Sequence, residues 1–206
     1  MFEGAHTALV TPFTDREVDE PAFRQLIDRQ FEAGIAGVVP CGTTGESPTL
    51  SNAEHRRVIE LAVEATAARG LVIAGTGSNS TREAITMTRF AEEAGADAAL
   101  LVCPYYNKPS QEGLFQHYKA IGESTSLPLV LYSIPGRSVI EISVETQARL
   151  HEACPNIKAM KEAGGEAERV SEIRAALPDS YEVLSGDDAL TIPFMERGAV
   201  GVVSVA

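Results

Sequence analysis

The sequence predicts a closed (β/α)8 barrel, or TIM barrel, and three observations lead to that fold class. Apolar runs of strand length recur through the whole 206-residue chain. They consist of Val, Ile, Leu and Ala without polar alternation, which is typical of strands covered on both faces in a parallel sheet. Segments of helical period separate them, so strands and helices alternate along the chain.

Eight strands are expected, over residues 7–10, 37–40, 71–74, 98–102, 129–132, 157–160, 182–184 and 200–205. An open doubly wound sheet would also alternate strands and helices, but eight strands at roughly even spacing favour the barrel. No linker rich in Pro, Gly or Ser divides the sequence. We therefore expect residues 1–206 to form a single domain.

Seven helices are expected between these strands. The first follows the segment 19–21, whose proline suits a first helical turn. Ser-x-x-Glu capping boxes at Ser51 and Ser80 open the second and third helices. Glycines are expected to end these three helices, at Gly34, Gly70 and Gly95. Apolar stripes predict the four later helices, around Leu114, Leu150, Val170 and Ile192.

The chain ends at Ala206, directly after the eighth expected strand. Barrels of this class usually need about 250 residues, so we expect the last helix and a C-terminal helical segment to be missing. The valines of the last strand would then lack cover, namely Val200, Val202, Val203 and Val205. We expect such a chain to be poorly active and prone to associate, because exposed apolar strands favour aggregation.

The composition of the chain limits the classes of partner and the cellular location that we expect. The chain carries 29 acidic and 17 basic side chains, for a formal net charge of −12. Such a surface repels phosphates, so neither nucleic acid nor an anionic membrane is an expected partner. No apolar run approaches the roughly 20 residues of a membrane span, and no basic region followed by an apolar stretch opens the chain. We expect a cytoplasmic protein that binds small molecules or other subunits.

Neither a disulfide framework nor a metal site is expected. The three cysteines, Cys41, Cys103 and Cys154, form no C-x-x-C pair. The four histidines are scattered, without an H-E-x-x-H motif. We interpret the cysteines as reduced packing residues.

Lys161 is the strongest catalytic candidate, because active sites of these barrels lie at the carboxyl ends of the strands. It is one of four lysines, and strand alternation is expected to place it on one face with Ile157 and Ala159. Desolvation on that apolar row would lower the amine's pKa and make it a nucleophile for a carbonyl substrate. The alternative is a structural lysine paired with Glu162 at the barrel rim.

Two neighbouring features complete the candidate site. Tyr132 closes the preceding strand; it is either a packing residue with its hydroxyl at the surface or a proton shuttle beside a Schiff-base lysine. The glycine-bracketed turn 42–47 has backbone N–H groups that suit a carboxylate. It lacks the Gly-Lys-Ser/Thr ending of a phosphate loop, so nucleotide binding is not expected.

Taken together, these residues resemble the dihydrodipicolinate synthase family, within the pyruvate-dependent class I aldolases that include N-acetylneuraminate lyase. The resemblance runs from Phe2 to Ala206. It is carried by six ordered motifs: Gly42-Thr-Thr-Gly-Glu-Ser47, Ala74-Gly-Thr-Gly77, Pro104-Tyr-Tyr-Asn-Lys-Pro109 with Gln111-Glu-Gly113, Tyr132-x-x-Pro-x-Arg137, Lys161-Glu-Ala-Gly164 and Leu184-Ser-Gly-Asp-Asp188. Ser133 and Ser138 depart from the Asn and Thr that are usual in the family.

The resemblance implies condensation of pyruvate with L-aspartate 4-semialdehyde to 4-hydroxy-tetrahydrodipicolinate, on the diaminopimelate route to lysine. Lys161 would form the imine with pyruvate, and Tyr132, Thr44 and Tyr106 would relay protons. Thr43 and Thr44 would hold the pyruvate carboxylate, and Arg137 that of the semialdehyde. Gly186 and Val203 would complete the pocket. No metal or organic cofactor is implied, since the lysine supplies the electron sink.

The resemblance also implies a homo-oligomer, a dimer of dimers in the full-length family, with Tyr106 entering the neighbouring subunit. L-lysine is a further implied ligand, at an allosteric site between subunits lined by Ser47, His55, Asn79, Glu83 and Tyr105. The alternatives are that Glu83 only completes a capping box and that His55 is a solvated helix residue.

Two other functions remain open at this point. A lyase or aldolase acting on sialic acid or a 2-keto-3-deoxy sugar acid would share the lysine chemistry, but Arg137 favours the synthase, because sugar-acid members tend to have an apolar or smaller residue there. A barrel without catalysis, acting as a binding or assembly subunit, is the second alternative. The presence of Lys161, Tyr132, Tyr106 and Thr44 together speaks against it.

Overall fold

Eight parallel strands close into a barrel in the computed structural model, which describes residues 1–15 and 17–206. Their order around the barrel is β1-β10-β9-β8-β7-β6-β5-β4, with β1 pairing both β10 and β4. The strands are β1 (Gly4–Ala8), β4 (Gly37–Val39), β5 (Leu71–Gly75), β6 (Ala98–Val102), β7 (Leu129–Ser133), β8 (Ile157–Glu162), β9 (Glu182–Ser185) and β10 (Gly201–Ser204). The predicted barrel is confirmed, and the open sheet is excluded.

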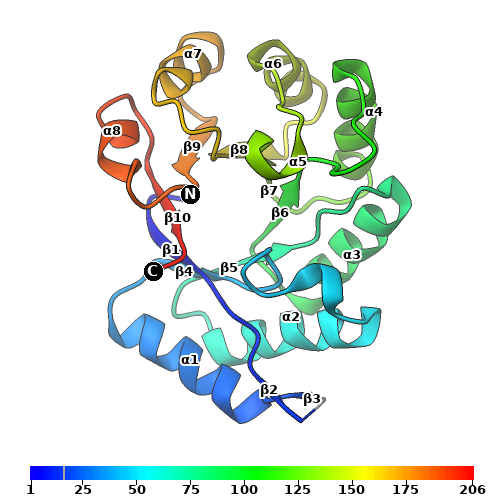
Figure 1. Cartoon of the computed structure of the whole chain (residues 1–206), viewed down its shortest axis with the longest axis vertical. Coiled ribbons are helices and arrows are strands. Elements are labelled where there is room, and N and C mark those ends of the chain that lie inside the picture. The colour runs from blue at the N-terminus through cyan, green and yellow to red at the C-terminus, as the bar shows by residue number, and fades with distance from the viewer. Residues whose placement is uncertain (16) are drawn as a thin grey trace.

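Helices form an outer ring around the strands, with α8 and α1 flanking the closing pair β10 and β1 (Figure 1). Their bounds are α1 (Glu20–Glu32), α2 (Asn52–Thr66), α3 (Thr81–Ala94), α4 (Gln111–Gly122), α6 (Val144–Ala153), α7 (Glu168–Ala176) and α8 (Thr191–Met195). All seven expected helices are present. They cover the outer faces of the strands, which explains why those strands lack polar alternation.

Three short elements were not predicted. A hairpin of two-residue strands, β2 (Phe13–Thr14) and β3 (Glu17–Val18), precedes α1. A 3₁₀ turn, η1 (Ser47–Thr49), precedes α2, and the one-turn helix α5 (Pro135–Ser138) follows β7. Each is too short to produce a hydrophobic period, so the sequence pattern carries no signal for it.

Several element boundaries differ from the prediction. The first strand spans Gly4–Ala8 rather than 7–10, since its backbone pairs with β10 from Gly4 onward. Helix α2 ends at Thr66 instead of continuing to Gly70, because Ala67 takes a left-handed conformation with φ of 48°. A Cβ on Gly70 would lie 2.5 Å from the carbonyl oxygen of Ala36. That glycine therefore serves a close backbone approach and does not end the helix.

Only one of the two predicted capping boxes forms. At α2, the Ser51 hydroxyl accepts from the N–H of Glu54 while the Glu54 carboxylate accepts from the Ser51 N–H. At α3, the Ser80 hydroxyl caps the N–H of Glu83, but the Glu83 carboxylate accepts from the hydroxyl of Ser78 instead. The side chain of Glu83 is thus drawn away from the helix end, toward a cavity described below.

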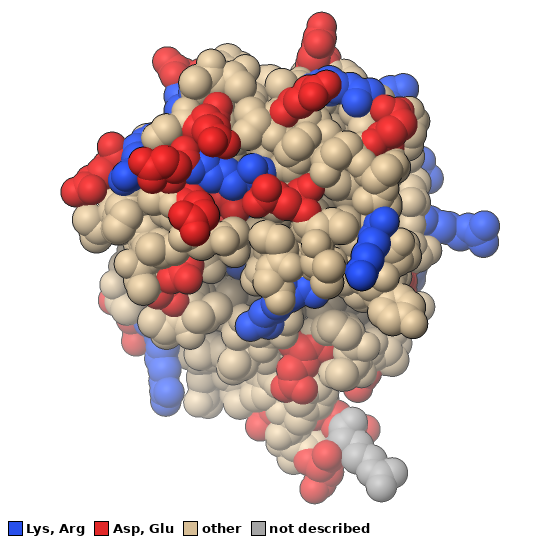
Figure 2. Space-filling model, turned by 45° about the horizontal axis from the view of Figure 1, so that its top comes forward, with Lys and Arg blue, Asp and Glu red and all other residues tan. Residues whose placement is uncertain are grey.

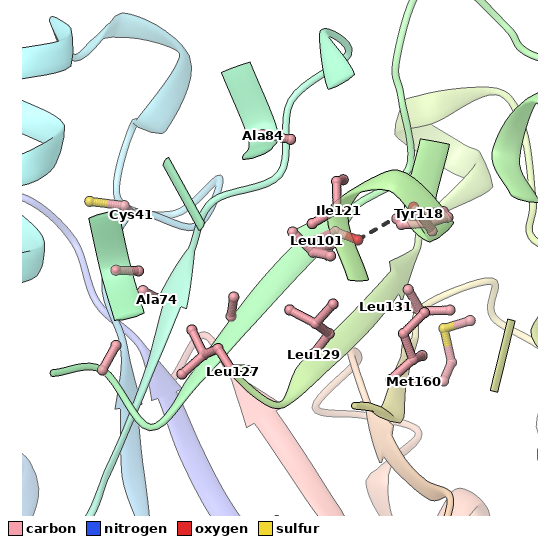
Figure 3. Close-up of a cluster of buried hydrophobic side chains, with 14 of the residues drawn as sticks. Cys41, Ala74, Ala84, Leu101, Tyr118, Ile121, Leu127, Leu129, Leu131 and Met160 are labelled. Atoms are coloured by element: carbon pink, nitrogen blue, oxygen red, sulfur yellow. Dashed lines mark hydrogen bonds between the residues drawn. The ribbon is translucent and has the colours of Figure 1, made fainter. Parts of the chain in front are cut away.

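Two hydrophobic clusters divide the core. One lies between strands and helices, and Figure 3 shows part of it, including the hydrogen bond from the Tyr118 hydroxyl to the Leu101 carbonyl oxygen. The other fills the barrel itself with side chains from alternate strand positions: Phe2, Ala8, Val39, Ile73, Ala98, Leu100, Val130, Tyr132, Ala159, Leu184 and Val203. Because the interior is packed with side chains, the barrel is no pore, and a ligand must bind at its rim.

The expectation that Ile157 shares the inner face with Ala159 and Lys161 is wrong. Ile157 belongs to the outer cluster and Ala159 to the inner one. The register of β8 on β7 shifts at this point, so that Leu129 pairs with Ile157 and Val130 with Ala159. This irregularity breaks the two-residue alternation between positions 157 and 159. Beyond it, Ala159 and Lys161 do share the inner face.

The last strand exposes less apolar surface than expected. Val203 packs inside the barrel, and Val202 is only 9% exposed, whereas Val205 is 61% exposed. Helix α8 contacts both β9 and β10, and β1 pairs with β10 on its other side. Of the four valines, only Val205 is fully exposed, beyond the paired part of the strand, and Val200 is half-buried.

Figure 2 shows acidic side chains in red interspersed with basic ones in blue on the face it presents. The three cysteines are free and buried, which confirms their assignment as packing residues. Within residues 1–15 and 17–206, no helix has the length and apolar character needed to cross a membrane.

Candidate active site

Lys161 and Tyr132 lie side by side at the carboxyl ends of β8 and β7. They are direct partners in the strand register, and both side chains are buried, with 5% and 7% exposure. The Nζ atom of Lys161 lies 4.1 Å from the centroid of the Tyr132 ring. The Tyr132 ring packs in the barrel interior, as the packing alternative expects, and it also lies against the amine, as a proton shuttle would require.

Burial makes the Lys161 amine easier to deprotonate. Its pKa falls from 10.5 to about 8, chiefly through desolvation and secondly through the positive charge of Arg137, while Asp188 opposes the shift. The alternative pairing with Glu162 is also wrong, because the Glu162 carboxylate accepts from Nε of Arg169, at 2.9 Å. An amine with this pKa is a far better nucleophile near neutral pH than an exposed lysine.

Gly186 packs against the Lys161 side chain, and Val203 lies in the barrel interior. The backbone N–H of Gly186 donates to the carbonyl oxygen of Glu162 at 2.7 Å, joining β9 to β8. A Cβ on Gly186 would lie 3.1 Å from Cε of Lys161 and 2.7 Å from Cβ of Ala163. Glycine thus leaves room for the lysine stem. Val203 is buried in the barrel interior, in the cluster that also contains Tyr132.

A cavity of about 230 Å³ opens beside Tyr132 at this end of the barrel. Arg137, on the one-turn helix α5, is the sole charged residue among the described residues that line it. The hydroxyl of Ser138 donates to the carbonyl oxygens of Ile134 and Ile140, which closes the turn that presents the arginine. Lys161 does not line this cavity, whereas Tyr132, whose ring contacts the amine, does. The other lining residues are Cys41, Gly42, Thr43, Ser47, Pro48, Gly75, Gly77, Leu100, Val102, Tyr105 and Ile134.

The turn 42–47 also reaches this cavity, through Gly42, Thr43 and Ser47. Its last three N–H groups are used inside the turn, donating to the carbonyl oxygens of Gly42 and Thr43. Within the described chain, the N–H groups of Thr43 and Thr44 donate to no protein acceptor. The N–H group of Gly42 likewise donates to no protein acceptor there, so the carboxylate cradle expected from the sequence is reduced to these three N–H groups and the threonine hydroxyls.

The expected proton relay is not assembled within one chain. Among the described residues, no hydrogen bond joins Thr44 to Tyr132 or to Tyr106. The Tyr106 side chain is 90% exposed, and its backbone has a φ of 73°. A left-handed tyrosine is strained, and such strain concentrates at functional loops. Tyr106 therefore points to solvent, while its neighbour Tyr105 lines the cavity.

The residues of the expected allosteric site gather in a second cavity of about 340 Å³. Ser47, His55, Glu83 and Tyr105 all line it, and the Asn79 amide donates to the carbonyl oxygen of Tyr105 at 3.2 Å. Four residues belong to both this cavity and the one beside Tyr132: Ser47, Pro48, Gly77 and Tyr105. The two cavities therefore share a wall.

His55 is not a solvated helix residue, because it is buried with 8% exposure. Its Nε2 lies 2.7 Å from the carbonyl oxygen of Gly75, which fixes Nε2 as the protonated nitrogen. Burial lowers the pKa of the imidazole, against the raising effects of that carbonyl group and of Glu83. The histidine is therefore neutral near pH 7 and belongs to the cavity wall.

Sequence reasoning missed a buried ion-pair network behind Lys161. Glu162 is completely buried and pairs with Arg169, whose Nη1 also lies 3.1 Å from the carboxylate of Glu141. Strand alternation carried a signal for Glu162, since a residue next to an inward lysine must point outward. Nothing in the pattern singled out Arg169. The described residues hold no group of three His, Cys, Asp or Glu side chains placed to bind a metal ion.

Comparison with proteins of known structure supports this geometry. The chain superposes on the 4-hydroxy-tetrahydrodipicolinate synthase of Methylacidiphilum fumariolicum SolV with a TM-score of 0.99 at 53% identity, covering 100% of this chain and 69% of that one. Two further structures superpose with a TM-score of 0.96. In each, the match covers 100% of this chain and 70% of the other chain. They are the Acinetobacter baumannii dihydrodipicolinate synthase complexed with pyruvate, at 47% identity, and the Cyanidioschyzon merolae enzyme with lysine bound, at 45%.

Sequence comparison gives the same result. The 4-hydroxy-tetrahydrodipicolinate synthase of Rhizobium meliloti is 52% identical over 205 residues, which are 100% of this chain and 70% of that protein. The model of the dihydrodipicolinate synthetase family matches residues 1–206. The chain therefore belongs to the dihydrodipicolinate synthetase family and has, by homology, the function of a 4-hydroxy-tetrahydrodipicolinate synthase, a lyase of lysine biosynthesis.

Proposed function

We propose that Lys161 forms a covalent imine with pyruvate and that this imine condenses with L-aspartate 4-semialdehyde. The observation that carries the proposal is the buried amine against the Tyr132 ring, with its pKa lowered to about 8. The neutral amine attacks the pyruvate carbonyl carbon, and water leaves as the imine forms. Loss of a methyl proton gives the enamine, whose carbon bonds to the aldehyde carbon of the second substrate while the aldehyde oxygen takes up a proton. The amino group of that substrate then attacks the imine carbon, which closes the ring and releases the Lys161 amine. No metal or organic cofactor enters these steps.

The other site residues have supporting roles in this proposal. Tyr132 moves protons at the carbonyl and imine stages; burial raises the pKa of its phenol, so it is a neutral donor near pH 7. The two unpaired N–H groups of Thr43 and Thr44 bind the pyruvate carboxylate. Arg137 binds the carboxylate of the semialdehyde in the cavity it lines, which favours the synthase over an aldolase for sugar acids.

The exposure of Tyr106 supports a second chain at the site. A strained, solvent-exposed tyrosine on a loop beside the cavity suits a side chain that reaches into a neighbouring subunit. We infer that Tyr106 completes the relay through Thr44 in the adjacent protomer, that a dimer is the smallest active unit, and that dimers pair into a tetramer. The buried free cysteines are consistent with the reducing cytoplasm that we infer for the protein.

Borohydride trapping across a pH series tests the proposed chemistry. Because the neutral amine attacks, the trapping rate with pyruvate is expected to rise with pH and to level off above about pH 8, following the pKa of Lys161. A lysine with the ordinary pKa of 10.5 would still be gaining rate there, and at pH 7 it would hold about 300-fold less neutral amine. Peptide mapping should place the label on Lys161. Label on Lys108, Lys119 or Lys158 would overturn the assignment.

A second ligand, L-lysine, is proposed for the cavity that contains His55 and Glu83. The cavity contains the Glu83 carboxylate, which suits an α-amino group, and polar backbone near Tyr105. It shares a wall with the cavity beside Tyr132, which offers a route to the active site. Calorimetry with L-lysine is expected to show binding that Glu83→Gln weakens about 10- to 150-fold, the scale of one charge-assisted hydrogen bond. Glu93→Gln, at an exposed position on the same helix, should bind as the parent does. No heat at millimolar L-lysine would contradict the site.

A further inference from the structure

The buried Glu162 carboxylate holds the turn that follows the catalytic strand. Its Oε1 accepts from the N–H of Gly164 at 2.7 Å, and its Oε2 accepts from Nε of Arg169 at 2.9 Å. Its backbone carbonyl oxygen accepts from the N–H of Gly186, the residue that packs against the Lys161 stem. The residue next to the lysine is thus fixed through both its side chain and its backbone.

The guanidinium of Arg169 reaches a second segment as well. Its Nη1 pairs with Glu141 at 3.1 Å, and its Nη2 donates to the carbonyl oxygen of Ile142. This segment continues from the turn that carries Arg137, and the Ser138 hydroxyl, bonded to the carbonyl oxygen of Ile140, stiffens the connection. The Arg169 side chain is 11% exposed and that of Glu162 is fully buried, so the bond between them is little weakened by water, whereas Glu141 is 40% exposed.

We propose that Arg169 is a positioning residue, which clamps the end of β8 to the segment after α5 and thereby sets the spacing between the Lys161 amine and the Arg137 guanidinium. The inference rests on the proposed function of those two groups. A planar, forked cation suits the task because it bonds to two carboxylates and a carbonyl group at once, which a lysine cannot do in this geometry. Arg169 touches neither group itself, so its effect is on their placement.

The clamp also has an electrostatic consequence. Without Arg169, the carboxylate of Glu162 would be buried and unpaired, which is strongly unfavourable. It would then take up a proton or pull away from Gly164, and either change loosens the turn beside Lys161. Misplacement of a reacting group by about 1 Å can cost roughly 100-fold in rate.

The test measures how fast borohydride traps the pyruvate imine at Lys161, in the parent and in three variants. Arg169→Met is expected to trap about 100-fold more slowly, and added methylguanidinium should restore part of the rate by filling the vacated place. Arg169→Lys should fall between the parent and Arg169→Met. The control is Val170→Ala, a buried apolar residue on the same helix, which should lose thermal stability yet trap within twofold of the parent.

Each outcome decides between positioning and general stabilisation. The proposal would be overturned if the trapping rate of Arg169→Met were within twofold of that of Val170→Ala. It would also be overturned if methylguanidinium restored none of the rate. If Arg169→Met does not fold, a rate for Arg169→Lys equal to that of the parent would overturn it instead. Failure of the parent chain to trap pyruvate at Lys161 would refute the proposed function itself, a result distinct from an unaffected Arg169 variant.

Discussion

Replacing Lys161 with methionine is expected to abolish covalent capture of pyruvate and to lower turnover on the order of 10⁶-fold, the scale found when a covalent nucleophile is removed. The thioether fills the same buried space beside Tyr132 but has no amine to form an imine. Mass spectrometry after borohydride reduction should show no added pyruvate on this variant.

Lys158→Met is the matched control for this experiment. Lys158 lies on the same strand, at the irregularity where β8 shifts its register on β7, and its side chain is partly exposed. Its replacement should leave both trapping and turnover near the parental level. Retained labelling in Lys161→Met would show that the imine forms on another amine.

Replacing Arg137 with alanine is expected to raise the KM for the semialdehyde far more than the KM for pyruvate. Loss of one charge-assisted carboxylate contact should cost about 1.5–3 kcal/mol in transition-state binding, or roughly 10- to 150-fold in kcat/KM. Steady-state kinetics with each substrate varied in turn measure the split. Equal effects on both substrates would remove Arg137 from the semialdehyde site.

The same substitution has a second, independent readout. The positive charge of Arg137 is one of the causes that lower the pKa of Lys161, so its removal should raise that pKa. The midpoint of the pH profile for imine trapping is therefore expected to move upward in Arg137→Ala. Arg137→Lys keeps the charge but loses the forked geometry, so it should preserve the midpoint while weakening semialdehyde binding. An unchanged midpoint in Arg137→Ala would mean that the two groups do not interact.

The shared wall between the two cavities gives the proposed lysine site a physical connection to catalysis. Ser47 and Tyr105 contact both spaces, so a ligand that moves either side chain changes the pocket beside Tyr132. Coupling of this kind requires that the ligand bind one arrangement of the wall better than another. His55 is neutral and is hydrogen-bonded to the carbonyl oxygen of Gly75. This bond holds the wall of the cavity that contains His55 and Glu83 in place.

The sequence by itself determined the barrel and predicted Lys161 as its strongest catalytic candidate. Apolar runs without alternation indicate strands that are buried on both faces. Their regular alternation with helical segments indicates the βα repeat. Both signals are local, because they depend on the periods of 2 and 3.6 residues in strands and helices. Lys161 was also found from the local pattern. A single charged side chain at the end of an otherwise apolar strand departs from the strand's pattern, and such departures are expected at functional sites.

Only the tertiary structure decided the surroundings of that amine. The register shift in β8 moved Ile157 to the outer face, and Glu162 found Arg169 instead of Lys161 as its partner. The first outcome depends on how two strands pair, and the second on how the helix after β8 packs behind that strand, which residue type alone does not specify. The αL conformation of Ala67 and the 90% exposure of Tyr106 are likewise set by packing and not by residue type. Local periodicity carries no information on such contacts, because their free energy arises only when the barrel closes.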